Sequence, residues 1–324
     1  MSRNVRVAGS LHEEGENVGL HRFALFTACS TAFLIFVGGL VTSNRAGLSV
    51  PDWPTSYGWN MFTFPYSKWV GGIFYEHGHR LVASFVGFLT VILASWTWLK
   101  DTRRWIRVLS LVALISVITQ GILGGLTVKY LLPTPISMTH ALLAQTFFCM
   151  TIAMAYFTSP SWKRGLPNIQ DTHVGISLPK LSLLTTGAVY LQLLLGAWMR
   201  HTESGLAIPD FPLAFGRLIP EFTNYHVTIH FAHRMGAILV AGMIAWTFVR
   251  MYVWHQHDNL LFRPALILVI LVFAQLALGA FTIWTEKSPV ITSVHVATGA
   301  LILGTSFLLT LRAYSMVARE AKWQ

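Results

Sequence analysis

Hydrophobic positions along the chain gather into eight long stretches separated by short polar segments. A helix that rises 1.5 Å per residue needs about 20 apolar residues to cross the hydrocarbon core of a bilayer. Each stretch is long enough, so the pattern predicts an all-α membrane protein with eight transmembrane helices. The predicted spans are residues 23–43, 80–99, 106–127, 137–158, 178–199, 229–250, 263–284 and 291–312.

Composition and charge support this assignment and orient it. The chain is 54% hydrophobic and 11% charged, with a mean hydropathy of +0.56, far from soluble proteins. The tails and the loops after the second, fourth and sixth spans carry nearly twice as many Lys and Arg residues as the opposite side, which predicts cytoplasmic termini. This asymmetry and attraction to anionic lipid explain the net charge of +10, so no nucleic-acid partner is expected. The N-terminus lacks the composition of a transit peptide, which favours a bacterial plasma membrane.

An internal repeat divides the eight spans into two sets. The segment AGLSVPDWPTSYG at residues 46–58 returns as SGLAIPDFPLAFG at residues 204–216, and QGILGGLT from Gln120 returns as QLALGAFT from Gln275. Four crossings preserve orientation, so the repeat predicts two pseudo-symmetric four-helix bundles duplicated in parallel. The expected divisions are a cytoplasmic tail (1–22), an N-terminal half (23–160), a cytoplasmic linker (161–177), a C-terminal half (178–314) and a cytoplasmic tail (315–324).

Four histidines recur at equivalent places in the two halves. His79 and His140 are 61 residues apart, and His233 and His295 are 62 apart. Each lies near the outer start of an even-numbered span, so each half can present two imidazoles as axial ligands of a heme iron. One such His could instead bond a backbone carbonyl, and zinc would need more ligands. Four matched intramembrane histidines favour two heme sites. The other histidines in tails, loops and span ends are expected at the surface: His12, His21, His173, His201, His226, His255 and His257.

Charged residues beside these histidines differ between the halves. Glu76 lies one helical turn before His79, whereas the second half has His230 at that place. A carboxylate there can stabilise developing positive charge or move a proton, or it can simply pair with Arg80. Arg80 and Arg234 each follow a predicted ligand and suit heme propionates, or they anchor helix ends at lipid headgroups. His77 points away from His79 on a helix and is the less favoured ligand.

Together these motifs resemble the heme A synthase family of integral membrane proteins. The resemblance covers the region from Gly38 to His295 and includes EHGHR at residues 76–80. It implies oxidation of the C8 methyl of heme O to the formyl of heme A by successive two-electron steps, with oxygen from water. It implies that His79 and His140 ligate the substrate heme, that His233 and His295 ligate a heme b, and that Glu76 is the essential acid. The implied partners are heme O, membrane lipid, a heme O synthase and cytochrome oxidase assembly factors.

The chain departs from this family at one motif. Many members carry two cysteines in the first outer loop, where this chain has Val50 and Ser56. Its two cysteines, Cys29 and Cys149, lie in different predicted spans and are expected to be unpaired packing residues. The alternative function is a bis-histidine diheme cytochrome that only transfers electrons. That alternative gives no role to a carboxylate present in one half alone.

Overall fold

The structure is a computed structural model that describes residues 2–171 and 175–317, with side chains from residue 18 on. Within these ranges the chain is helical and forms no strand. Eight helices are long and apolar enough to cross a membrane, the first over Val18–Ser43. Three 3-10 turns, Met61–Thr63, Tyr66–Lys68 and Ser204–Leu206, lie in the loops. The helices are α1 (Ser2–Ser43), α2 (Gly72–Lys100), α3 (Arg104–Lys129), α4 (Thr134–Thr158), the short α5 (Pro160–Arg164), α6 (Leu178–His201), α7 (Tyr225–Trp254), α8 (Asn259–Trp284) and α9 (Pro289–Val317).

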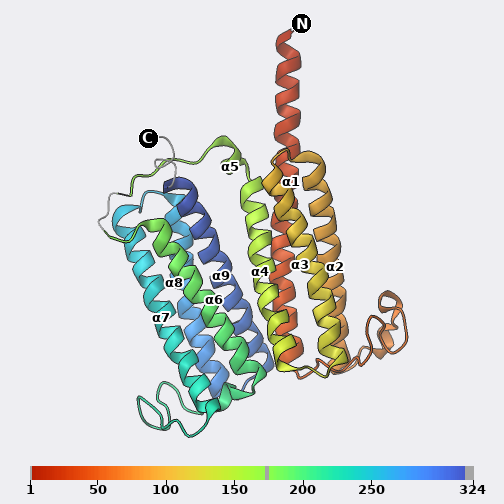
Figure 1. Cartoon of the computed structure of the whole chain (residues 1–324), viewed down its shortest axis with the longest axis vertical. Helices are drawn as coiled ribbons and strands as arrows, with labels where there is room; N and C mark the ends of the chain where they lie inside the picture. The colour runs from red at the N-terminus through yellow and green to blue at the C-terminus, as the bar shows by residue number, and fades with distance from the viewer. Residues whose placement is uncertain (1, 172–174, 318–324) are drawn as a thin grey trace.

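Contacts between helices follow two rings (Figure 1). Helix α1 packs on α2 and α4, and α3 packs on α2 and α4; in the same way α6 and α8 each pack on α7 and α9. The two rings meet where α1 and α4 contact α9 and where α4 contacts α6. Helix α5 follows α4 at the end of the molecule where α9 ends.

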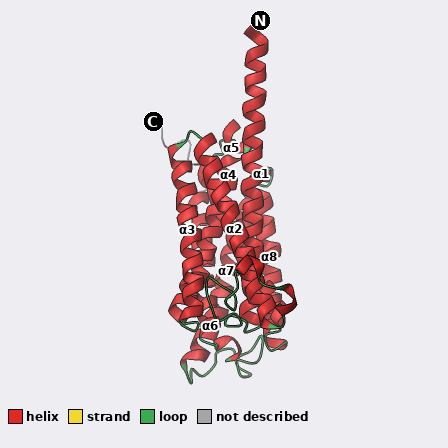
Figure 2. Cartoon of the chain, turned by 90° about the vertical axis from the view of Figure 1, so that its right-hand side faces the viewer, coloured by secondary structure: helices red, strands yellow, loops and turns green. Residues whose placement is uncertain are grey.

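Several helices begin earlier than hydropathy predicts. Helix α2 begins at Gly72 instead of residue 80, and α7 begins at Tyr225 instead of residue 229. Hydropathy averages miss these first turns because they contain polar residues, Glu76, His77 and His79 in α2 and His226 and Thr228 in α7, although the backbone is already helical. Helix α1 begins at Ser2, and its first part stands beyond the ring of helices (Figure 2).

Apolar side chains are divided between the interior and the outer surface. The largest buried cluster lies in the second ring and includes Leu178, Ile244 and Leu303. Large apolar side chains on the outside, such as Phe88 and Ile270, are about 60% exposed (61% and 60%). A soluble protein would not expose so many, so the outward faces suit lipid.

Two long loops lie at the end of the molecule opposite α5, one beside each ring of helices (Figures 1 and 2). The first lid loop, residues 44–71, joins α1 to α2, and the second lid loop, residues 202–224, joins α6 to α7. Both contain a cis X-Pro bond, Trp53–Pro54 in the first and Phe211–Pro212 in the second. We call this side of the molecule the loop end.

Candidate functional site

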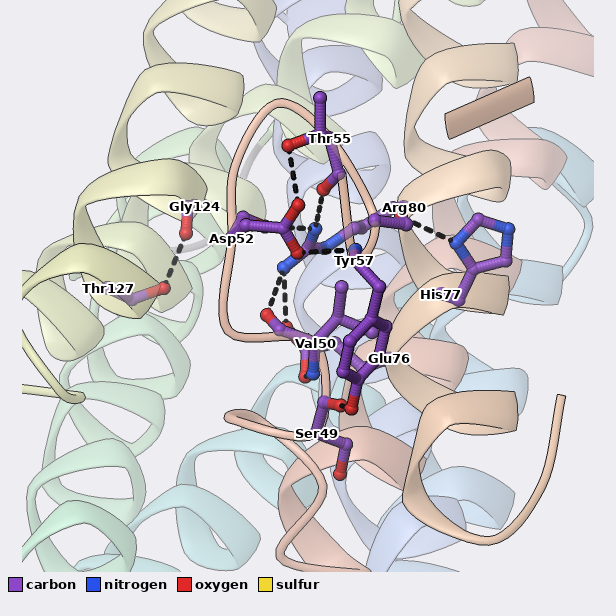
Figure 3. A network of polar contacts seen from close by, with 11 residues as sticks. Ser49, Val50, Asp52, Thr55, Tyr57, Glu76, His77, Arg80, Gly124 and Thr127 are labelled. Carbon is purple, nitrogen blue, oxygen red and sulfur yellow. Dashed lines mark hydrogen bonds and ion pairs between the residues drawn. The ribbon is translucent and has the colours of Figure 1, made fainter. Parts of the chain in front are cut away.

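Arg80 fastens the first lid loop to helix α2. Its guanidinium donates hydrogen bonds to the carbonyl oxygens of Val50 at 2.8 Å, Asp52 at 2.7 Å and Thr55 at 2.9 Å (Figure 3). Charge-assisted hydrogen bonds of this kind are worth about 1.5–3 kcal/mol each. One side chain therefore fixes a turn of six residues above the start of α2.

Arg234 makes the same clamp in the second half. It donates to the carbonyl oxygens of Ile208 at 3.2 Å, Asp210 at 2.6 Å and Leu213 at 2.8 Å. Each acceptor lies 158 residues after its counterpart at Arg80. Arg80 and Arg234, which were predicted to bind heme propionates, thus bind the lid loops through their guanidinium groups. Their contact with a propionate remains a prediction.

A half-buried aspartate in each lid loop accepts hydrogen bonds from backbone N–H groups of the same loop. The carboxylate of Asp52 accepts hydrogen bonds from the N–H groups of Tyr57 at 2.7 Å and Gly58 at 2.8 Å. Burial raises the pKa of Asp52, but these hydrogen bonds outweigh it and leave that pKa below the usual value. In the second loop, hydrogen bonds from Gly216 and its neighbour likewise lower the pKa of Asp210. Both carboxylates are therefore ionised at neutral pH and hold their turns.

Glu76 lies under the first lid loop, and His230 takes its place under the second. One Glu76 oxygen pairs with Arg80 at 2.7 Å, and the other accepts the N–H of Val50 at 2.7 Å. Only 4% of Glu76 is exposed. Nδ1 of His230 accepts the N–H of Ile208 at 3.2 Å, the equivalent backbone group. Both halves thus have this hydrogen bond between helix and lid loop, but only the first half makes it with a carboxylate.

His77 belongs to the first lid loop rather than to a histidine pair. It is fully buried, with Ser56 Oγ 3.0 Å from its Nδ1. The rings of Trp69 and Phe64 lie 4.6 and 4.9 Å away, centroid to centroid. Phe231 is the counterpart in the second half, where the pocket is apolar. His77 therefore contacts the first lid loop, and its being the less favoured ligand stays a prediction.

Each of the four repeated histidines lies against a glycine of the preceding long helix. The four histidines lie six to eight residues after the first residue of α2, α4, α7 and α9, so they share a similar depth near the loop end. A methyl group added to any of these glycines would lie 3.1–3.4 Å from the imidazole. The absence of a side chain therefore makes room for each ring. The pairs are Gly38 with His79, Gly124 with His140, Gly196 with His233, and Gly279 with His295.

Each ring of helices contains two of these histidines. His79 and His140 lie on α2 and α4, which both pack on α1 and α3, and His233 and His295 lie on α7 and α9, which both pack on α6 and α8. Nδ1 of both His140 and His295 is buried without a hydrogen-bond partner in the described part of the chain. Such a nitrogen is costly to bury unpaired, which leaves these rings with unused bonding capacity.

The donor set fits a heme better than a bare metal ion. Across residues 18–171 and 175–317, no three His, Cys, Asp or Glu side chains gather as a metal cluster. Structural and catalytic zinc sites use three or four protein ligands, whereas a low-spin heme iron takes two axial imidazoles. Two imidazoles in each half match the second requirement.

Glutamines of the repeated QGILGGLT and QLALGAFT segments contact the fourth-helix histidines. Nε2 of Gln120 donates to the backbone oxygen of His140 at 3.0 Å, and Nε2 of Gln275 lies 3.4 Å from Nε2 of His295. The repeat in these segments thus corresponds to a repeated contact with the histidine of the next helix.

Gln192 is a further contact that sequence reasoning missed. Its Nε2 lies 3.1 Å from Nδ1 of His233 and donates to the His233 backbone oxygen at 2.8 Å. The repeat places Leu34 at the equivalent position in the first half. A lone Gln without a matching partner gave no signal, because the site was inferred from what the halves share.

Some peripheral predictions were wrong. His255 is 7% exposed and hence buried, not on the surface; His12 and His173 lie outside the side chains that the structure describes. Both cysteines are unpaired as expected, but Cys29 is exposed and not packed. A surface position was inferred from proximity to span ends, and that inference fails where a loop folds back over the helix.

Comparisons with known proteins agree with the repeated motifs. The model of a family described as "Cytochrome oxidase assembly protein" matches residues 21–307. The chain is 29% identical over 294 residues to a protein named "Heme A synthase" from Halalkalibacterium halodurans, covering 88% of this chain and 92% of that one. It is 25% identical to one from Shouchella clausii, over 93% and 98% of the two chains, and 27% identical to one from Shewanella oneidensis, over 86% and 92%.

The matched region contains all eight membrane spans except the first residues of the α1 span and the end of α9, and it includes both lid loops and the four repeated histidines. A match over most of the chain is not explained by a shared apolar composition, because the loops and polar motifs are included. The chain belongs to the family of cytochrome oxidase assembly proteins.

Proposed function

We propose that this protein is a heme A synthase, an oxidoreductase that converts the C8 methyl of heme O to the formyl group of heme A for terminal cytochrome oxidases. The observation that carries this proposal is the similarity, over nearly the full length, to proteins named "Heme A synthase". Matched histidine pairs with one carboxylate beside only one of them support it.

We assign the substrate heme to His79 and His140, and a resident heme b to His233 and His295. The glycine beside each imidazole and the presence of two such histidines in each ring of helices support this assignment. In this proposal the halves, residues 23–160 and 178–314, are pseudo-symmetric four-helix bundles linked by residues 161–177. The termini, residues 1–22 and 315–324, are cytoplasmic, and the loop end faces the outside of a bacterial plasma membrane. A heme O synthase and oxidase assembly factors are the expected partners.

The reaction removes four electrons in two steps. In each step one C–H bond of the carbon is broken, a C–O bond to the oxygen of a water molecule forms, and two protons and two electrons are released to an oxidant outside the chain. The first step gives an alcohol and the second a gem-diol, which then loses water to give the aldehyde. The heme b site supplies a route for electrons when it is loaded. The residues of this chain bind the substrate iron, exclude bulk water with the lid loop and place a fixed charge.

Glu76 supplies that charge. Its carboxylate is held by Arg80 and by the N–H of Val50, each at 2.7 Å, so it does not need to reorganise as positive charge develops at the substrate carbon. Each oxygen keeps a free lone pair that can accept a proton released when water attacks. The reactive half is thus the N-terminal one.

One observation favours the alternative, a bis-histidine diheme cytochrome that only transfers electrons. His230 accepts the equivalent loop N–H, so Glu76 could be a loop anchor with no chemical role. The alternative predicts that any residue able to accept the Val50 N–H can replace Glu76.

The variant Glu76→His separates the two functions, because the second half shows that a histidine makes this loop contact. We expect Glu76→His to keep both hemes and a protease-resistant first lid loop while heme A production stops in a strain that depends on it. The control His230→Glu, at the other site, should leave production largely intact. Continued formation of heme A by Glu76→His would remove the proposed role of the carboxylate.

A further inference from the structure

Arg200 carries a charge near the loop end of α6 and forms no ion pair with an acidic side chain in the described part of the chain. Its Nη2 donates to the backbone oxygen of Gly39 and to Ser43 Oγ, both at 2.9 Å. In the described part of the chain no carboxylate lies within ion-pair distance of it; Glu203 instead pairs with Lys287 at 3.3 Å. The N–H groups on Nε and Nη1 have no recorded acceptor in that part of the chain.

Arg200 lies where the two rings of helices meet. Its acceptor Gly39 directly follows Gly38, which packs on His79. Its other acceptor, Ser43, receives a hydrogen bond of 3.0 Å from Ser293 of α9. Helices α1, α6 and α9 therefore converge on this guanidinium.

The same residue is close to the C-terminal histidine pair. Gly196, which packs on His233, is four residues before Arg200 on α6, so both lie on one helix face, with Arg200 one turn nearer the loop end. A heme held between the imidazoles of His233 and His295 would have Arg200 beside its edge at the loop end.

A half-buried guanidinium between membrane helices is costly unless an anion meets it. Its planar set of N–H donors matches a carboxylate, and a heme carries two carboxylates on one edge. The equivalent position in the first half is Thr42, so the feature belongs to one site only. We propose that Arg200 binds a propionate carboxylate of the heme held by His233 and His295. This inference rests on the proposed heme-binding function of that pair.

Heme b and its dimethyl ester, in which both carboxylates are masked, test the proposal directly. Full-length protein carrying His79→Ala, so that only the C-terminal site is loaded, is titrated with each heme in neutral detergent. The His79→Ala protein with no further substitution should bind heme b more tightly than the dimethyl ester. Arg200→Gln should weaken heme b binding about ten-fold or more and leave ester binding unchanged. Arg200→Lys should retain part of the preference.

Arg45→Gln is the matched control, because Arg45 is an exposed arginine at the loop end of α1 and should change neither affinity. Equal weakening of heme b and ester by Arg200→Gln would mean a structural role and overturn the proposal, as would no effect on either. A variant that loses only its response to added phosphatidylglycerol would assign Arg200 to a lipid phosphate instead. If the His79→Ala protein binds no heme, or His233→Ala does not abolish its binding, the proposed C-terminal site itself fails, whatever Arg200 does.

Discussion

Replacement of Gly196 by alanine tests whether the glycines set the positions of the histidine rings. The added methyl would lie 3.1 Å from Cε1 of His233, closer than ordinary van der Waals contact, so the ring or the helix must move. Overpacking of this kind costs about 1–3 kcal/mol. If the ring moves, the cost appears as weaker heme binding, about 5- to 150-fold.

Gly187→Ala is the matched control on the same helix. A methyl there meets nothing within 4 Å. Both substitutions gain the same helix propensity, about 1 kcal/mol, so their difference isolates the contact with His233. Gly124→Ala and Gly279→Ala, whose methyl groups would lie 3.4 Å from a ring, should have milder effects.

The assay is titration of purified apoprotein with heme b, followed by the spectrum of the bis-histidine heme and by thermal unfolding of the apoprotein. We expect Gly196→Ala to weaken one of two binding phases and to alter its spectrum, with Gly187→Ala unchanged. If both variants bind heme with equal affinity and equal spectra, the glycine does not position the ligand and the reasoning is refuted.

Three further changes probe the surroundings of the site. Arg80→Gln should release the first lid loop, seen as faster proteolysis within residues 44–71, while the second lid loop stays protected; Arg234→Gln should do the reverse. Gln192→Leu, which copies Leu34 of the first half, should shift the midpoint potential of the C-terminal heme and leave the other unchanged in a redox titration. Hydrogen bonds lower the pKa of Asp52 in the folded loop. Its contribution to the stability of the first lid loop is therefore complete above the unfolded pKa near 3.8 and is lost as the pH falls through the lower folded value. Proteolysis of this loop should rise in that acidic range in the parent protein, whereas in Asp52→Asn it should show no further rise.

Features that repeat or that depend on local composition could be predicted from the sequence. The eight helices follow from apolar runs, and His79 with His140 could be singled out because His233 and His295 repeat their spacing. The asymmetry at Glu76 was also visible, since it needs only the alignment of the halves. In each case the signal lies within one segment or in a comparison of two.

Other features depend on contacts between distant segments. The clamp by Arg80 requires the first lid loop to turn three carbonyl groups toward one guanidinium. Tyr57, whose backbone is in the left-handed region, helps to shape that loop. Gln192 and Arg200 have no counterpart in the first half, so the repeat did not mark them. Arg200 meets Gly39 across 161 residues of sequence, and only the packing of helices brings them together.

Chromatography of the hemes extracted from purified protein tests the central claim most directly. The parent protein should yield heme b together with heme O or heme A. His79→Ala should lose the heme O and heme A and keep heme b, and His233→Ala should lose heme b. Heme b alone in the parent protein, released in part by either variant, would contradict a heme A synthase and indicate a diheme electron carrier.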